Sequence, residues 1–95
     1  SRRERNRRNR LLCLRIHGEI CKGCNLLPKK IYNTAGNIIE VHHLEPVSML
    51  KTPRAYNPET DLIPLCPNCH RAVHTRSPWP LSLQELRDLM SAKDD

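Results

Sequence analysis

Phenylalanine is absent from this chain of 95 residues, and two tyrosines and one tryptophan are its only aromatic residues. Leucine, isoleucine and valine must therefore form most of the core, although a domain of this length buries only a modest share of its surface. A domain with so small an apolar core needs an additional stabilising element, such as a bound metal ion or disulfide bonds. The five cysteines are the obvious source of that element.

Long apolar runs are also absent: no stretch approaches the roughly 20 residues of a membrane span, and none resembles the core of a signal peptide. We therefore expect a cytoplasmic protein without a membrane partner. Because the chain begins with Ser1 rather than methionine, we expect it to be part of a longer protein, in which a recognition domain could lie upstream.

Acidic residues are scarce at the N-terminus, where residues 1–10 contain one glutamate and six arginines, and the whole chain has a formal net charge of +6. The arginines are Arg2, Arg3, Arg5, Arg7, Arg8 and Arg10. Such a basic segment favours a polyanionic partner, most often nucleic acid, with an anionic membrane surface as the weaker alternative. A solvated helix face or a disordered tail explains the same arginines equally well. If the arginines instead contact phosphates, the release of counterions from the nucleic acid would favour binding.

The N-terminal half predicts a helix and a strand, and a second strand follows later in the chain. Residues 2–17 have a helical pattern of leucine and isoleucine, and Gly18 is placed to end the helix. Residues 38–41 are the best candidate for the first strand, because three of the four are β-branched. Residues 62–65 predict the second strand, in which Pro64 requires an edge or an end position.

Two irregular segments and two more helices complete the expected secondary structure. The stretch after Cys24 and residues 45–60 contain proline, asparagine or glycine at several positions and predict turns and loops. Residues 67–75 predict a short helix, and the last helix begins at Ser82, which forms a capping box with Glu85. The last helix is expected to pack four side chains onto the core, namely Leu83, Leu86, Leu89 and Met90.

Four of the five cysteines form two CxxC pairs, a pattern typical of structural zinc sites. The pairs are Cys21 with Cys24 and Cys66 with Cys69. Four thiolates complete the tetrahedral coordination of Zn²⁺ and leave no open position for substrate, so we expect a structural role. Disulfide bonds are the alternative, which a reducing compartment disfavours, and a redox CxxC is less favoured because there are two pairs. The fifth cysteine, Cys13, is expected to be a buried helix residue.

Four of the five histidines occur in two close groups. His70 and His74 are four residues apart, so on a helix they share one face, where two imidazoles can bind one ion. His42 and His43 are adjacent, and adjacent side chains of a strand point to opposite faces, so we expect them to have different functions. For His42 and His43, the alternative is that they are plain polar residues at a strand end. For His70 and His74, the alternative is that one of them is a zinc ligand in place of a cysteine.

Three segments together resemble one known family. They read EVHHLEPVS from Glu40, DLIPLCPNC from Asp61 and HRAVH from His70. They resemble the HNH endonucleases of the ββα-metal (His-Me finger) fold, and most closely the zinc-containing branch found in McrA-like, modified-DNA-dependent restriction enzymes. Colicin-type DNases share the HHxxPxS element and the Hx3H pair. The resemblance implies a bacterial, archaeal or phage origin.

The resemblance implies a small α+β fold and a division of the chain. A ββα-metal core with a structural zinc site of four cysteines is expected over residues 20–76. A basic N-terminal helix or arm is expected over residues 1–19, and a C-terminal helix that packs on the core over residues 77–95.

The resemblance also implies a role for each histidine of the two groups. His43 would be the general base that takes a proton from the attacking water, a task for which an imidazole of pKa about 6.5 is well suited near neutral pH. His42 and His70 would hold one catalytic divalent cation, with His74 as a third ligand or a phosphate contact. The cation could be Mg²⁺, Mn²⁺, Ni²⁺ or Zn²⁺, and the products would end in 5′-phosphate and 3′-hydroxyl.

One position departs from the pattern of the family, which usually has asparagine where this chain has Asp61. In the family that residue mainly holds a loop by hydrogen bonds, which a carboxylate can accept but cannot donate; we expect activity to be retained. Glu40 lies on the strand face of His42 and could accept a hydrogen bond from a histidine ligand, although a surface role is equally compatible. Arg71, next to His70, is a further candidate for contacting DNA.

These observations predict a metal-dependent DNA endonuclease domain. We expect it to be the cleaving part of a restriction enzyme that could depend on base modification, with a DNA-recognition domain upstream and with pairing into a homodimer as an open alternative. One competing function is a catalytically inactive, zinc-stabilised module that binds nucleic acid, which the aspartate at position 61 would allow. The other is a bacterial toxin DNase, which would use the same chemistry.

Overall fold

The computed structural model describes residues 6–92, so the predictions for Arg2, Arg3 and Arg5 lie outside the described residues. The helices are α1 (Arg7–His17), α2 (Pro28–Tyr32), α3 (Pro67–Val73) and α4 (Leu83–Ser91), and the 3-10 helices are η1 (Asn33–Ala35) and η2 (Val47–Met49). The strands are β1 (Glu40–His43) and β2 (Leu62–Leu65). None of the described helices is long and apolar enough to cross a membrane.

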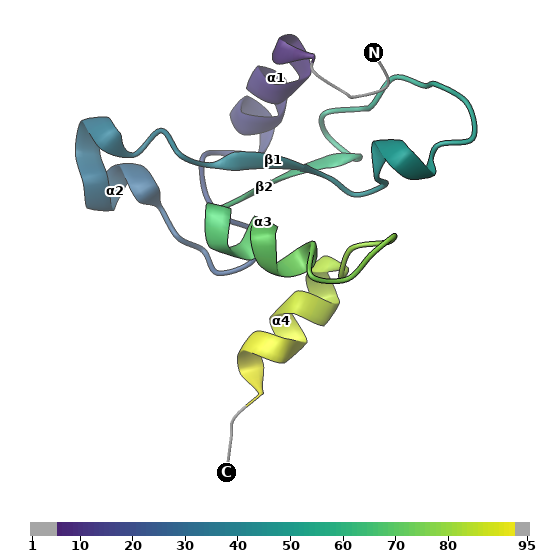
Figure 1. Ribbon diagram of the computed structural model, residues 1–95. Helices are drawn as coiled ribbons and strands as arrows, with labels where there is room; N and C mark the ends of the chain where they lie inside the picture. The colour runs from purple at the N-terminus through teal and green to yellow at the C-terminus, as the bar shows by residue number, and fades with distance from the viewer. Residues whose placement is uncertain (1–5, 93–95) are drawn as a thin grey trace.

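A two-stranded antiparallel sheet forms the centre of the fold, with β1 paired to β2. Glu40 pairs with Leu65 and His43 pairs with Leu62. Helix α1 lies on one side of the sheet and α3 on the other, with α4 beyond α3 (Figure 1). The succession β1, β2, α3 is the ββα arrangement expected from the sequence.

The buried side chains form two clusters, one on each side of the sheet. The cluster on the α3 side contains Cys21, Ile39, Leu65, Cys66, Cys69, Val73 and Leu86. The smaller cluster on the α1 side contains Cys13, Tyr56 and Leu62. The buried position predicted for Cys13 is therefore confirmed. Neither cluster is large, as expected for a chain with few aromatic residues.

Local capping interactions place the ends of the helices. Gly18 ends α1 with a φ of 83°, and its N–H donates to the carbonyl of Leu14, in a backbone conformation that favours glycine. Pro67 occupies the first turn of α3, where no N–H is needed. The capping box of Ser82 and Glu85 begins α4 as predicted.

The first strand begins later in the chain than predicted. It spans Glu40–His43 instead of residues 38–41, so both adjacent histidines lie within it. The reason is the pairing with β2, because the ladder continues past the strand through a hydrogen bond from the Leu44 N–H to the Asp61 carbonyl. The second strand has the predicted bounds, and Pro64 is tolerated because each strand of a two-stranded sheet is an edge strand.

Two other predictions are corrected by the structure. The stretch after Cys24 was expected to be turns and loop, but it contains α2 and η1, because Pro28 is suited to the first position of a helix. In α4, Leu86 is buried and Leu83 packs at the edge of the core, whereas Leu89 and Met90 are exposed. Helix α4 is only nine residues long, and its second half extends beyond the core (Figure 1).

The contrast between Leu86 and Leu89 on the same helix gives a test of the packing. Leu86 is 4% exposed and Leu89 is 62% exposed. Leu86→Ala is expected to lower the free energy of unfolding by about 2 to 4 kcal/mol, because it leaves a cavity in the main cluster. Leu89→Ala is expected to lower it by less than about 0.5 kcal/mol. Urea unfolding of both variants followed by circular dichroism measures the difference, and equal losses would contradict this packing of α4.

Candidate active site

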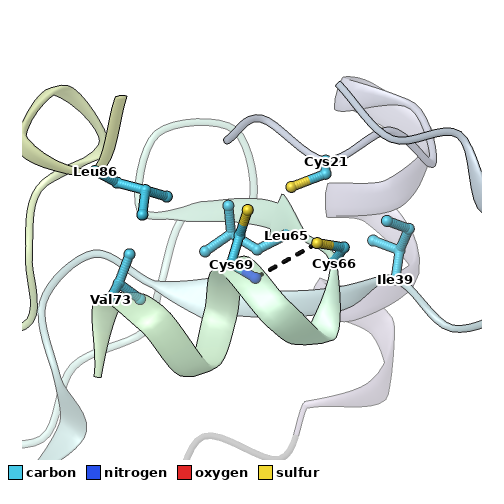
Figure 2. Close-up of a cluster of buried hydrophobic side chains, with 7 residues drawn as sticks. All are labelled: Cys21, Ile39, Leu65, Cys66, Cys69, Val73 and Leu86. Carbon is cyan, nitrogen blue, oxygen red and sulfur yellow. Dashed lines mark hydrogen bonds between the residues drawn. The ribbon is translucent and has the colours of Figure 1, made fainter. Parts of the chain in front are cut away.

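Four cysteines from two knuckles come together at the start of α3. Their Sγ atoms all lie within 4.8 Å of one another, and those of Cys24 and Cys66 are 3.8 Å apart. In each knuckle the N–H of the second cysteine donates to the sulfur of the first, at 3.5 Å from Cys24 to Cys21 and 3.4 Å from Cys69 to Cys66. Figure 2 shows the sulfurs of Cys21, Cys66 and Cys69 among the buried side chains of this cluster.

The chemistry of this group, hereafter the cysteine cluster, fits a tetrahedral metal ion. All four thiols are free. Burial raises the pKa of Cys24 and Cys69. At Cys21, backbone hydrogen bonds from Cys66, Cys24 and Gly23 outweigh burial and lower the pKa to about 7, which favours at this one thiol the thiolate that metals bind. Gly23 is required by close packing, because a Cβ there would lie 2.9 Å from the sulfur of Cys69. The four cysteines would hold the structural Zn²⁺ that is expected from the sequence.

Three imidazoles come together on the α3 side of the sheet. His42 of β1 faces His70 of α3 and His74 just after it, with ring centroids 5.2 and 5.0 Å away, and the last two rings are 5.0 Å apart. One nitrogen of each lies within 4.8 Å of the others. This group, hereafter the histidine cluster, brings together the three residues that the resemblance implies as ligands of a cation.

Burial and charge favour the neutral form of His42 and His74. His42 is 2% exposed, and its Nδ1 is buried without a hydrogen-bond partner among the described residues. Burial, followed by the charges of His70, His74 and His43, lowers the pKa of His42 to about 3. Burial and His70 also lower the pKa of His74. Neutral imidazoles with an unpartnered buried nitrogen are what a divalent cation requires of its ligands.

Glu40 lies beside the histidine cluster and holds one of its rings. Its Oε1 is 2.7 Å from Nδ1 of His70. This contact leaves Nε2 of His70 for a cation, and a carboxylate behind a ligating imidazole both orients the ring and increases its basicity. Glu40 therefore lies where it could orient a histidine of the cluster, and the ring that it contacts is His70 of α3.

His43 lies on the opposite side of the sheet from the histidine cluster, as expected for the residue after His42 in a strand. Its ring packs edge-on against Tyr56, with centroids 4.7 Å apart. A hollow beside His43 is also lined by Arg7 and Arg10 from α1. Two of the predicted arginines are thus close to the expected base.

Asp61 holds the loop that precedes β2. Its Oδ2 accepts a hydrogen bond from the Asn57 N–H at 2.7 Å and from Arg54 at 3.1 Å. The Asn57 N–H, and then Arg54, keep the pKa of Asp61 below its usual value despite partial burial. All these bonds need only an acceptor, which explains why aspartate can hold the loop here.

The contacts of two residues in the loop before β2, namely Arg54 and Tyr56, were not foreseen from the sequence, although Arg54 was one of several unranked candidates for a phosphate contact. Arg54 also forms an ion pair with Glu45 at 2.7 Å and lies over the ring of Tyr56, with Cζ 4.9 Å from its centroid. No spacing pattern marks these residues, because their contacts with His43 and Asp61 arise only when the loop folds back. Arg71 lines the hollow that contains His70 and His74, and Arg8 lies apart from both histidine groups, in a groove on α1.

The cysteine cluster is expected to bind one metal ion through thiolates, and Cys13 provides a matched control. Titration with Co²⁺ should give the near-ultraviolet absorbance of a cobalt–thiolate site in the wild type. Cys66→Ser should lose that absorbance, because a neutral hydroxyl is a poor ligand. Cys13→Ala should keep it, because Cys13 is buried in the other cluster. Identical spectra for the two variants would show that these four thiols do not form the site.

The comparisons with known proteins agree with this geometry. The family model for HNH endonuclease matches residues 21–76, which is more than half of the chain. The match includes both CxxC pairs, both strands, α3 and all four grouped histidines, whereas α1 and α4 lie outside it. Searches of curated proteins and of solved structures gave no significant match. The chain therefore belongs to the HNH endonuclease family, and this membership supports a nuclease-type function.

Proposed function

We propose that the chain is a metal-dependent DNA endonuclease domain that hydrolyses phosphodiester bonds to 5′-phosphate and 3′-hydroxyl ends. The observation that carries the proposal is the opposite orientation of two adjacent side chains of β1. His42 turns toward the imidazoles of α3, and His43 turns to the other side of the sheet. A cation site and a separate base at one strand are the two components that this hydrolysis needs.

Each histidine then has a distinct task. His42, His70 and His74 would hold one divalent cation, which when bound supplies Lewis-acid stabilisation of the charge on the phosphate and the leaving 3′ oxygen. His43 accepts a proton from the water whose oxygen attacks the phosphorus, and the bond from phosphorus to the 3′ oxygen breaks. Glu40 keeps the ring of His70 oriented throughout. Imidazole ligands suit Zn²⁺, Ni²⁺ and Mn²⁺ as well as Mg²⁺.

Two hollows on the surface share Glu40 as a lining residue, and together they suggest a path for the DNA backbone. One contains the imidazoles of α3 together with Arg71, and the other contains His43 with Arg7 and Arg10. The shared residue lies on β1, whose outer edge carries no further strand among the described residues. A phosphodiester chain laid across this edge would place one phosphate between the histidine cluster and His43, with arginines near the phosphates on both sides.

The test of the proposal is cleavage of supercoiled plasmid. The purified protein is treated with EDTA and then supplied with Mg²⁺, Mn²⁺, Ni²⁺ or Zn²⁺. His43→Ala is expected to lower kcat by about 100- to 10,000-fold, because a general base is lost. His17→Gln serves as the matched control, since glutamine can still donate to the Glu59 carbonyl that His17 contacts; its rate should stay within about twofold of the wild type.

The outcomes separate the competing functions. Equal rates for the wild type and His43→Ala in every metal would refute the nuclease assignment for this site. Plasmid binding without cleavage in any metal would instead support the inactive binding module. A toxin DNase would give the same cleavage result, and only an inhibitory partner protein would distinguish it.

The role of α1 in binding DNA is tested by two arginines on the same helix. In the His43→Ala background, Arg7→Gln is expected to weaken binding to a short duplex about fivefold and to reduce the slope of log Kd against log salt by about one. Arg15 is also exposed on α1 but does not line the hollow of His43. Arg15→Gln should therefore change the slope less, as measured by fluorescence anisotropy, and equal effects would show that the hollow has no special role.

We further propose that the chain is the cleaving part of a restriction-type enzyme. The arginines near the site would contact phosphates, which carry no sequence information. Selection of a target, including any dependence on base modification, would then come from another domain. The described residues contain one histidine cluster, so cutting both strands of a duplex would require a second copy of the chain or a second encounter.

A further inference from the structure

Tyr56 is the aromatic side chain that packs against the proposed base. It is 4% exposed, and its ring meets that of His43 edge-on, with centroids 4.7 Å apart and an interplanar angle of 76°. Edge-to-face aromatic contacts of this kind prefer a defined relative orientation of the two rings. The orientation of the His43 ring is therefore linked to the position of Tyr56.

Tyr56 is itself fixed by contacts on several sides. Its hydroxyl donates to the Glu45 carbonyl at 2.9 Å, and its own carbonyl accepts from the side-chain amide of Asn9 on α1 at 3.1 Å. The guanidinium of Arg54 lies over its ring, an arrangement with a favourable cation–π attraction. The Glu45 bond ties Tyr56 to the chain that leaves β1, and the Asn9 bond ties it to a helix outside the family match.

Arg54 connects this aromatic pair to the two ends of the loop. It forms ion pairs with Glu45 at 2.7 Å, just after β1, and with Asp61 at 3.1 Å, just before β2. Exposed ion pairs contribute little to stability, but here two of them share one guanidinium that also covers Tyr56. The loop between β1 and β2 is thereby held in the conformation that places Tyr56 against His43.

The position of His43 gives this contact a function. His42, His70 and His74 would be oriented by ligation if they hold a cation, whereas His43 lies on the other side of the sheet. We propose that Tyr56, held by Arg54, is a positioning residue that orients the imidazole of His43 toward the attacking water. This inference rests on the proposed endonuclease function. It means that the loop between β1 and β2 affects the rate of DNA cleavage as well as the stability of the fold.

The test compares three tyrosine variants in the metal-loaded protein. Tyr56→Leu removes the aromatic edge contact and is expected to lower kcat by about 10- to 100-fold with KM changed less than about threefold. Tyr56→Phe keeps the ring and should stay within about threefold of wild-type kcat. Tyr32→Leu is the matched control, because Tyr32 is 51% exposed on α2, and it should leave kcat and KM unchanged.

A double-mutant cycle separates positioning from a general loss of structure. If Tyr56 acts through His43, adding Tyr56→Leu to His43→Ala should lower the remaining rate by less than about twofold, since the base is already absent. A loss as large as in the wild-type background would overturn the proposal. So would Tyr56→Phe as slow as Tyr56→Leu, or Tyr56→Leu with wild-type kcat.

Arg54 provides a second route if Tyr56→Leu does not fold. Arg54 is on the surface, and Arg54→Met removes the cation and both ion pairs without changing the tyrosine side chain itself. It is expected to lower kcat by about three- to tenfold, and wild-type kcat in this variant would contradict the inference. Failure of the proposed function itself is distinct, because then the wild type would not cleave DNA in any metal.

Discussion

The pairing of β1 with β2 is the constraint on which the site depends. The register places His42 opposite Ile63 and His43 opposite Leu62, and because neighbouring side chains of a strand point to opposite faces, the two imidazoles must separate. A shift of one residue would exchange them and would place His43 among the imidazoles of α3. Every proposal about the chemistry therefore depends on a ladder of four residue pairs.

The cysteine cluster supports this ladder from one side. It joins the knuckle around Gly23 to the first turn of α3, and the Lys22 N–H of that knuckle donates to the Pro64 carbonyl at the outer edge of β2. Helix α3 carries His70, and His74 follows directly after its last residue, so the placement of α3 sets the distances among the clustered imidazoles. A chain with two small buried clusters gains the most from such a cross-link, because its apolar core alone supplies limited stability.

The loop between the strands supports the ladder from the other side. Asp61 receives hydrogen bonds from Asn57 and Arg54, and Arg54 also reaches Glu45 at the far end of the loop. Asp61 is thus part of a network that needs only a hydrogen-bond acceptor at this position. The same network fixes Tyr56, which packs against His43. The loop and the side of the sheet that carries His43 therefore form one packed unit.

Local patterns in the sequence predicted much of this molecule. These patterns depend on residues a few positions apart. They predicted the two cysteine knuckles, the shared face of His70 and His74, the second strand and the capping box at Ser82, and the structure contains all of these features. The sequence did not reveal α2, the later start of β1 or the exposure of Leu89, because propensity and periodicity do not say where a core ends.

The tertiary structure alone decided the surroundings of His43. Arg54, Tyr56 and Asn9 meet near His43 only after the loop folds back onto α1, and no local pattern records contacts between residues so distant in the chain. Glu40 was a candidate from the sequence, but its partner on α3 was set by packing across the sheet. The sequence by itself therefore determined which side chains are candidates for the chemistry, and the packing of loop, sheet and helices decided how they are oriented.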